Sequence, residues 1–353
     1  MAAAPSQAFE DLLVDHVLFY VDDIEAKTAW LVDGYGFAVY AAGGDPAPAR
    51  SVGLGRRDIR LVLTEPLVGD HPGAAYVERH GDGVADIALR VADAGVAFEE
   101  AVRRGARPVS APAEHGGVVT ATIIGFGDVT HTFVQRSGGG DERALHGLRP
   151  VAPAAGAWDA GLNGMDHFAI CVEAGQLEPT VAFYEQVLDF AMIFTERIVV
   201  GAQAMNSQVV QSRSGAVTLT LIEPDLSCSP GQIDDFLKNH GGAGVQHIAF
   251  IADDIVRAVG SINATGVAFL NTPGAYYRQL TKRLTLSRHS VDELQRLSIL
   301  VDQDHYGQLF QIFTRSVHTR KTFFLEIIER IGARTFGSNN IKALYEAVEL
   351  EAA

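Results

Sequence analysis

The chain has 353 residues, of which 47% are hydrophobic and 20% charged, so it is long enough for two domains and apolar enough to bury a core in each. Asp and Glu outnumber Lys and Arg by 43 to 28, and the net charge of −15 argues against nucleic acid or an anionic membrane as a partner. Two cysteines cannot form a disulfide framework and no long apolar run occurs, so a soluble cytoplasmic protein without a secretory signal is expected.

A series of motifs in the first half recurs in the second half. The first motif of each copy contains an Asp-His dipeptide within an apolar run, and the later motifs follow in the same order while the spacing between copies grows slowly. Chance similarity would not keep this order, so the chain contains a duplicated architecture. The paired segments are 14–21 with 165–172, 61–66 with 219–224, 83–88 with 244–249 and, more weakly, 95–98 with 266–269.

A stretch rich in Gly, Ala and Pro separates the two halves. It covers about residues 137–164 and is expected to form a linker. We therefore predict an N-terminal domain of residues 1–150 and a C-terminal domain of residues 151–353.

Within each half, short β-branched and aromatic runs alternate with helical stretches. This pattern predicts an α+β fold with helices on one face of each sheet and a concave face that can line a cavity. Residues 276–306 are polar and helix-prone, and the chain ends in an amphipathic helix with Ile341, Leu344, Tyr345 and Val348 on one stripe. The other elements expected in the second half are strands at 166–172, 216–222, 245–251 and 308–313, and helices at 183–188, 233–239 and 255–265.

Three residues of the second half are candidate metal ligands. His167 and His247 lie in the middle of predicted strands, and Glu326 lies in an apolar strand where an unpaired carboxylate would be costly. Spacings of 80 and 79 residues indicate that they come from separate strands. Two imidazoles and one carboxylate that face a common cavity form the facial triad of non-haem Fe(II) oxygenases, which leaves coordination positions open for substrate and O₂.

The first half carries different residues at the corresponding positions. A single buried histidine in a strand is more often a core residue than a ligand, so the comparison between the halves matters. His16 aligns with His167, but Asp86 aligns with His247, and the sequence offers no counterpart of Glu326. We therefore predict that the first half binds no metal and that hydrogen bonds satisfy its two polar residues.

The motifs of this chain resemble the 4-hydroxyphenylpyruvate dioxygenase family, within the vicinal oxygen chelate superfamily. The resemblance implies two tandem double modules of βαβββ type, each an open, barrel-like sheet with helices outside, and a C-terminal helix that closes the cavity. The matching segments cover nearly the whole chain and include 166–169, 231–234, 244–249, 272–277, 309–314, 324–330 and 336–346.

The resemblance also implies roles for individual residues. His167, His247 and Glu326 would hold Fe(II), and Ser207 and Gln311 would be catalytic residues in or beside the substrate pocket. The substrate would be 4-hydroxyphenylpyruvate with O₂, and no separate 2-oxoglutarate is expected because the substrate itself carries the 2-oxo acid. A homodimer is one allowed assembly. Substrate contacts are implied for Thr220, Ile222, Phe313, Phe336, Asn340 and Ile341.

Three positions depart from the pattern of the ring-hydroxylating dioxygenases. Thr220 replaces a Pro and Ile222 an Asn in the middle strand, and Ile341 replaces a Phe beside the last helix. Loss of an aromatic wall lets the substrate ring tilt, and a displacement of about 1 Å changes reactivity by orders of magnitude. We expect benzylic hydroxylation to 4-hydroxymandelate and CO₂. The resemblance implies that this product would supply 4-hydroxyphenylglycine for a nonribosomal peptide antibiotic. The alternative within the family is ring hydroxylation to homogentisate in tyrosine catabolism.

Alternatives from other classes make different demands on the sequence. A non-enzymatic small-molecule binding protein would not need a buried triad, and a glyoxalase-like isomerase would need a fourth ligand that the strands do not supply. An extradiol ring-cleaving enzyme would need a His or Tyr beside the metal. Tyr276 or Tyr277 is a candidate for that role, although their Gly-Ala-Tyr-Tyr setting is equally typical of a surface turn.

Overall fold

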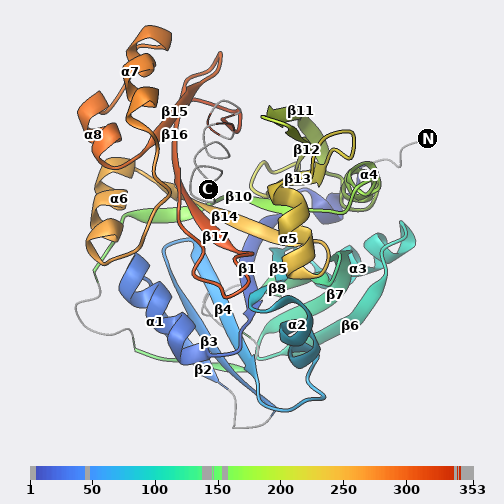
Figure 1. The fold of residues 1–353 in the computed structure, drawn as a ribbon. Coiled ribbons are helices and arrows are strands. Elements are labelled where there is room, and N and C mark those ends of the chain that lie inside the picture. Colours follow the sequence, from blue (N-terminus) through green and yellow to red (C-terminus); the bar gives the residue numbers. More distant parts are fainter. Residues whose placement is uncertain are drawn as a thin grey trace.

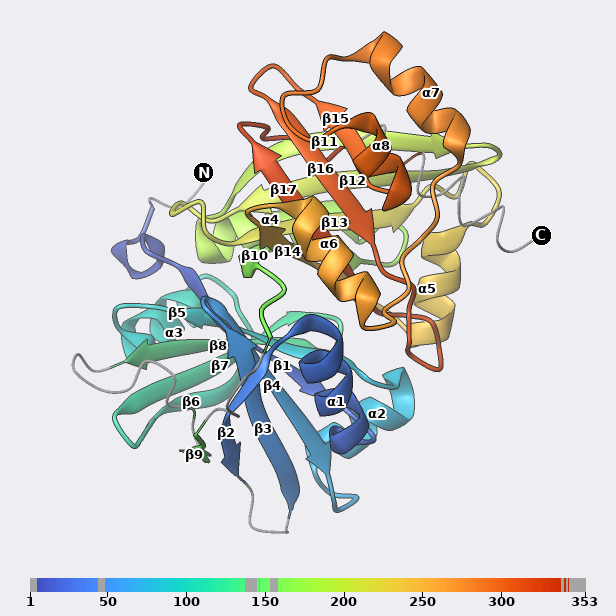
Figure 2. The same cartoon turned by 90° about the vertical axis from the view of Figure 1, so that its left-hand side faces the viewer.

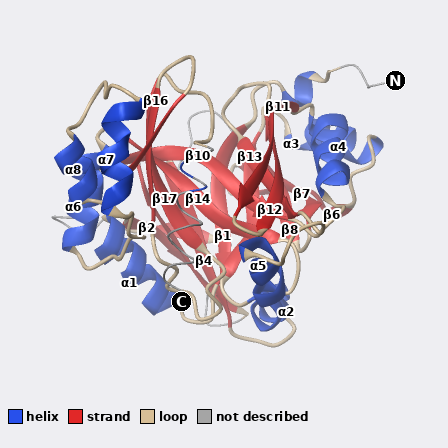
Figure 3. Cartoon of the chain, turned by 45° about the horizontal axis from the view of Figure 1, so that its top comes forward, coloured by secondary structure: helices blue, strands red, loops and turns tan. Residues whose placement is uncertain are grey.

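The computed structural model describes residues 5–43, 48–136, 145, 147–152, 158–337, 340 and 342. These residues form two curled sheets, one from each half of the chain (Figure 1, Figure 2), and helices surround the sheets (Figure 3). The arrangement confirms the predicted α+β fold of tandem modules. No helix in the described ranges is long and apolar enough to cross a membrane.

The N-terminal half forms a nine-stranded sheet. Its elements are η1 (Gln7–Phe9), β1 (Leu13–Tyr20), α1 (Ile24–Tyr35), β2 (Ala38–Gly43), β3 (Ala49–Arg56), β4 (Ile59–Pro66), α2 (Pro72–His80), β5 (Gly83–Arg90), α3 (Ala94–Arg103), β6 (Pro108–His115), β7 (Val118–Phe126), β8 (Val129–Arg136) and β9 (Leu148–Pro150). The strand order is β6-β7-β8-β5-β1-β4-β3-β2-β9. Two βαβββ modules, one starting at β1 and the other at β5, therefore join where these two strands pair antiparallel.

The C-terminal half forms an eight-stranded sheet with the same plan. Its elements are β10 (Leu162–Cys171), α4 (Leu177–Leu188), β11 (Ala191–Val200), β12 (Gln203–Gln211), β13 (Thr218–Pro224), α5 (Gln232–His240), β14 (Gly244–Ala252), α6 (Ile255–Ala264), α7 (Gly274–Arg283), α8 (Val291–Arg296), β15 (Leu300–Gln303), β16 (Gln308–Phe313) and β17 (Phe324–Ile331). The strand order is β11-β12-β13-β10-β14-β17-β16-β15. The modules again join through an antiparallel pair, β10 with β14.

Most elements expected in the second half lie at or near the predicted places. Helix α4 begins at Leu177, ahead of the expected 183–188, and β10 begins at Leu162, inside the stretch expected to be a linker. The same stretch also contains β9, which pairs with β2 at the edge of the first sheet. Residues 137–144, 146 and 153–157 of the expected linker and most of the expected closing helix, including Ile341, lie outside the described residues.

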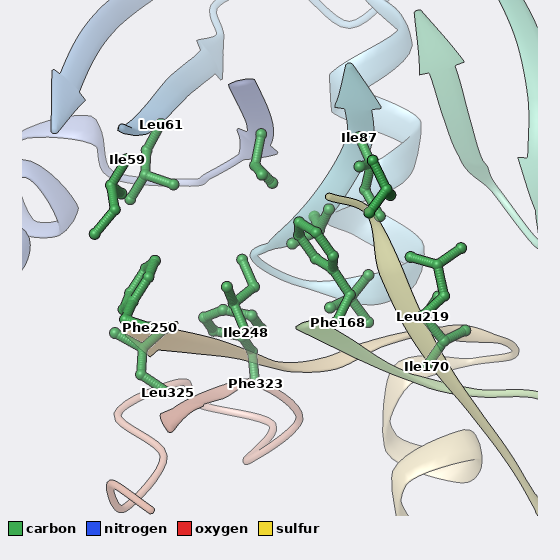
Figure 4. Close-up of a cluster of buried hydrophobic side chains, with 14 of the residues drawn as sticks. Ile59, Leu61, Ile87, Phe168, Ile170, Leu219, Ile248, Phe250, Phe323 and Leu325 are labelled. Carbon is green, nitrogen blue, oxygen red and sulfur yellow. The ribbon is translucent and has the colours of Figure 1, made fainter. Parts of the chain in front are cut away.

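The two sheets pack against each other through one hydrophobic core (Figure 4). Side chains such as Phe168, Ile248 and Leu325 from the second sheet share this core with Ile59 and Ile87 from the first. Burying each side chain of this size contributes about 1.5–3 kcal/mol. Successive residues of a strand point to opposite faces, so the residues just before or after these core positions line the other face of the second sheet.

Candidate metal centre

The three predicted ligands lie on adjacent strands. His167 comes from β10, His247 from β14 and Glu326 from β17, and these strands are neighbours in the sheet. Ala169 pairs with His247, and Ala249 pairs with Glu326. Because paired residues share a face and side chains alternate along each strand, all three ligands point away from the hydrophobic core.

The three side chains converge with the spacing of ligands around one ion. His167 Nε2 lies 3.4 Å and His247 Nε2 3.2 Å from Glu326 Oε2, and one ligand atom of each residue lies within 4.8 Å of the others. Metal–ligand bonds of about 2.1 Å place neighbouring ligands about 3 Å apart. Glu326 is 1% exposed, and among the described residues its Oε1 has no hydrogen-bond partner. A buried, half-satisfied carboxylate is costly without a cation, so this donor set fits a divalent metal such as Fe(II).

A chain of hydrogen bonds orients one of the imidazoles. His167 Nδ1 lies 2.8 Å from Asp166 Oδ1, and Arg330 binds both carboxylate oxygens of Asp166. Arg330 also donates to the carbonyl oxygen of Thr335 at 2.6 Å. A carboxylate behind a histidine fixes the ring and the tautomer that leaves Nε2 free for a metal. The second imidazole is held differently, because His247 stacks on Phe324 with the ring centroids 4.9 Å apart.

The charges of the metal-free site follow from this geometry. Burial lowers the pKa of His167, but the carboxylates of Glu326 and Asp166 outweigh that effect and raise the pKa to about 9. Burial acts to raise the pKa of Glu326, yet attraction to His167 holds it below its usual range. Burial lowers the pKa of His247. In the metal-free triad His167 is therefore protonated on both ring nitrogens at neutral pH. A metal binds only the neutral imidazole, so it must displace the proton on Nε2.

Strand register places the predicted residues of β12 and β13 on the face of the triad. Thr220 pairs with Ala169, two residues from His167, and Ile222 follows two residues after Thr220. Ser207 pairs with Ile222. The three predicted residues are buried, and Thr220 Oγ1 has no hydrogen-bond partner in the described part of the chain.

Strand β16, which pairs with β17, carries two more of the predicted site residues. Phe313 on β16 pairs with Glu326, so it shares the ligand face, and Gln311 lies two residues earlier on the same face. Gln311 is 2% exposed, and its Oε1 is unpartnered within the described ranges. Phe313 makes an edge contact with His247, with centroids 5.8 Å apart. The face of the triad thus combines aromatic walls with buried polar atoms that are available to a ligand.

Two of the predicted substrate-contact residues, Phe336 and Asn340, follow β17 and are described by the structure. The ring of Phe336 contacts His167 edge-on, with centroids 5.3 Å apart, and the Arg330 guanidinium lies 5.1 Å from the same ring. Asn340 is fully buried, and its side-chain amide lies 3.1 Å from the hydroxyl of Tyr276. Ile341, the third departure from the ring-hydroxylating pattern, lies outside the described residues.

Of the two alternatives left open for Tyr276 and Tyr277, the structure supports neither a surface turn nor a catalytic position. Both residues lie in the first turn of α7, and Tyr277 is only 1% exposed. The Tyr276 hydroxyl donates to the carbonyl oxygen of Val301, and the Tyr277 hydroxyl donates to that of Ile299. With both hydroxyls bound to backbone, neither tyrosine is placed as the acid or base that an extradiol enzyme requires.

A residue of the first sheet occupies the strand position that corresponds to Glu326, although it is not a carboxylate. Asp86 pairs with Thr130 on β8, as His247 pairs with Phe324 on β17, so Thr132 occupies the position of Glu326. Sequence comparison missed it because a threonine does not resemble a glutamate. His16 faces Asp15 at 2.8 Å, and Asp86 accepts hydrogen bonds from Thr130 and Thr132, but Asp86 Oδ1 has no partner in the described part.

Sequence reasoning also missed Arg330, Asp166 and Phe324, which support the ligands. One signal was available for the first two. Each half has an Asp-His dipeptide on its first strand and an arginine near the end of the corresponding later strand, β8 or β17. The structure pairs Asp15 with Arg136 just as it pairs Asp166 with Arg330.

Comparison with known proteins agrees with this architecture. Residues 164–312 match the model of the glyoxalase/bleomycin resistance protein/dioxygenase superfamily, and residues 50–147 match that of the N-terminal region of hydroxyphenylpyruvate dioxygenase. The 4-hydroxyphenylpyruvate dioxygenase of Dictyostelium discoideum is 36% identical, over 95% of this chain and 96% of the relative. That of Caenorhabditis briggsae is 33% identical, over 96% and 91%.

A solved structure shows the same fold. A mutant of 4-hydroxymandelate synthase from Streptomyces coelicolor is 41% identical, covers 98% of this chain and 100% of its own, and superposes with a TM-score of 0.87. Identity at this level over almost the full length, together with the tandem modules, shows that the chain belongs to the 4-hydroxyphenylpyruvate dioxygenase family.

Proposed function

We propose that this dioxygenase is an Fe(II) enzyme that converts 4-hydroxyphenylpyruvate and O₂ into 4-hydroxymandelate and CO₂. The buried triad carries the proposal, because Glu326 has an oxygen without a hydrogen-bond partner among the described residues and faces His167 and His247 at ligand distance. The similarity to a 4-hydroxymandelate synthase supports the choice of product.

The proposed catalytic domain is the C-terminal half, residues 151–353. His167, His247 and Glu326 would hold Fe(II), which would supply Lewis-acid and O₂-activating chemistry beside the bound 2-oxo acid. The chain's own part is to hold the substrate in place. Buried polar groups of Ser207 and Gln311 would accept or donate hydrogen bonds to it, and Phe313 would form an aromatic wall beside the ring.

The choice of product depends on how the pocket holds the ring. Ile222 belongs to an apolar cluster with Ala169, Cys171 and Met205. An asparagine at this position would present an amide to the substrate, whereas Ile222 presents only methyl groups. We infer that the ring is therefore not anchored at this wall and that the benzylic carbon lies nearer to the oxidant, since small shifts in pose decide which bond reacts.

Ring hydroxylation to homogentisate is the competing outcome, because the curated relatives named above are 4-hydroxyphenylpyruvate dioxygenases. The two products are isomers, so mass alone cannot distinguish them. Chromatography against both standards, after incubation of the iron-loaded chain with 4-hydroxyphenylpyruvate in air, tests the proposal. A 4-hydroxymandelate product would suit a supply of 4-hydroxyphenylglycine for nonribosomal peptide antibiotic synthesis.

A further inference from the structure

The first sheet carries a cavity at the position that corresponds, by strand register, to the triad of the second sheet. It has a volume of about 780 Å³, within the range of small-molecule sites. His16, Asp86 and Thr132, the register counterparts of the three ligands, all line it. The first sheet therefore has a ligand-sized cavity at the register position of the triad, and these counterparts offer one imidazole and one carboxylate.

The chemistry of this cavity centres on Asp86. Its side chain is 7% exposed, and both threonine hydroxyls, Thr130 at 2.5 Å and Thr132 at 2.7 Å, bind the same oxygen, Oδ2. Oδ1 is buried without a hydrogen-bond partner in the described part. A buried carboxylate oxygen that lacks a donor costs about 1–3 kcal/mol or more, and burial accordingly raises the pKa of Asp86 against the effect of the hydroxyls.

The other charged residues that line the cavity are already paired. Arg79 binds Asp128 at 2.8 Å, and Arg136 binds Asp15. No Lys or Arg of the described residues contacts Asp86, and the nearby imidazole of His16, whose attraction acts to lower the pKa of Asp86, already faces Asp15 at 2.8 Å.

The rest of the lining suits an aromatic molecule. Leu18, Val62 and Val118 give apolar walls, and the rings of Tyr20 and Tyr76 lie 5.6 Å apart at one side. Aromatic faces also attract cations by about 0.5–2 kcal/mol.

We propose that this cavity is a second ligand site, which binds a small aromatic amine with its ammonium group on Asp86 Oδ1. The ammonium would supply the missing donor and neutralise the buried charge, and the ring would lie against the apolar walls. The lining residues all belong to the first half of the chain, so we expect occupation of this site to leave the reaction at the triad unchanged.

Tyramine and 4-hydroxyphenylacetate are the probes, because they share the ring and differ in the sign of the charged group. Calorimetric titration of the full chain near neutral pH should show binding of tyramine and at least about tenfold weaker binding of the anion. Asp86→Asn should weaken tyramine binding at least about tenfold, since the amide keeps an acceptor for the threonines but loses the charge. Turnover of 4-hydroxyphenylpyruvate should not change.

Two further variants make the test specific. Asp93→Asn removes a charge from the same half but outside the cavity lining, and asparagine caps α3 equally well, so it should leave tyramine binding unchanged. Val109→Trp places a bulky group in the lining at an exposed position of β6, so it should weaken binding even if Asp86→Asn unfolds. The proposal is overturned if tyramine does not bind, if the anion binds as well, or if binding is lost in Glu326→Ala but kept in Asp86→Asn.

Discussion

Arg330 donates two hydrogen bonds to Asp166, from Nε to Oδ2 at 2.7 Å and from Nη2 to Oδ1 at 2.8 Å. Oδ1 of the same carboxylate also contacts Nδ1 of His167. Burial acts to raise the pKa of Asp166, but the guanidinium and the imidazole hold it well below its usual range. Asp166 therefore stays ionised and keeps the Nδ1 proton of His167 in place. The arginine lies four residues after Glu326 on the same strand, so one strand supplies both a ligand and the support of another ligand.

The first prediction concerns this support. Asp166→Asn should weaken Fe(II) binding by roughly 10- to 100-fold, because the amide cannot hold the imidazole as a carboxylate does. Asp15→Asn is the matched control, since Asp15 has the same relation to His16 and Arg136 in the half without a triad. Iron affinity measured by titration under nitrogen should fall only in Asp166→Asn. Equal affinities of the two variants would contradict a role for Asp166 at the metal.

The second prediction concerns the ligands. Single changes of His167, His247 or Glu326 to Ala should abolish iron binding and turnover, while unfolding stays cooperative because the main hydrophobic core lies on the other face of the strands. His16→Ala should retain iron. Metal content by atomic spectroscopy and a thermal melt check both statements. Full iron stoichiometry with normal activity in Glu326→Ala would rule out the assignment.

The third prediction is the pH dependence of metal affinity. The pKa of His167 in the metal-free site is raised to about 9 by Glu326 and Asp166 against the effect of burial. Below about pH 9 the incoming ion must displace this proton, so affinity should fall as pH falls, by up to about tenfold per unit. Titrations in two buffers of different ionisation enthalpy should detect release of one proton per ion near pH 7. Affinity that is flat between about pH 6.5 and 8 would contradict the expectation.

The fourth prediction concerns the wall of the pocket. Ile341→Phe should restore an aromatic side chain of the ring-hydroxylating pattern and lower the yield of 4-hydroxymandelate, with some ring oxidation or uncoupled 4-hydroxyphenylacetate. Ile222→Asn adds an amide on the face of the triad and should act in the same direction. Product ratios by chromatography are the measurement. An unchanged ratio in both variants would show that these positions do not select the product.

The strands of the second sheet could be predicted because their apolar residues are continuous or alternate over short runs. The positions of His167 and His247 within β10 and β14 followed from that pattern. The pairing of Arg330 with Asp166 could not be found locally, because 164 residues separate them and only the strand order brings them together. The role of Thr132 likewise depends on register, which the sequence of a single strand does not contain.

At helix α7 the local sequence pattern was misleading, because it suggested a turn where the structure has a helix. The Gly-Ala-Tyr-Tyr sequence is typical of a turn, but it forms the first turn of α7, directly after Pro273 at the N-cap. Tyr277 then buries its ring, and its hydroxyl finds a backbone acceptor in Ile299. Tertiary packing of a large aromatic side chain outweighed the local preference for a turn.

The most direct test of the account is the product that the unmodified chain forms from 4-hydroxyphenylpyruvate. The protein should be loaded with Fe(II), supplied with O₂ and given no 2-oxoglutarate, and the products should be separated against standards and examined by proton NMR at the benzylic position. We predict 4-hydroxymandelate as the main product, with one O₂ consumed for each substrate decarboxylated. Homogentisate as the main product, or an absolute requirement for added 2-oxoglutarate, would contradict the account.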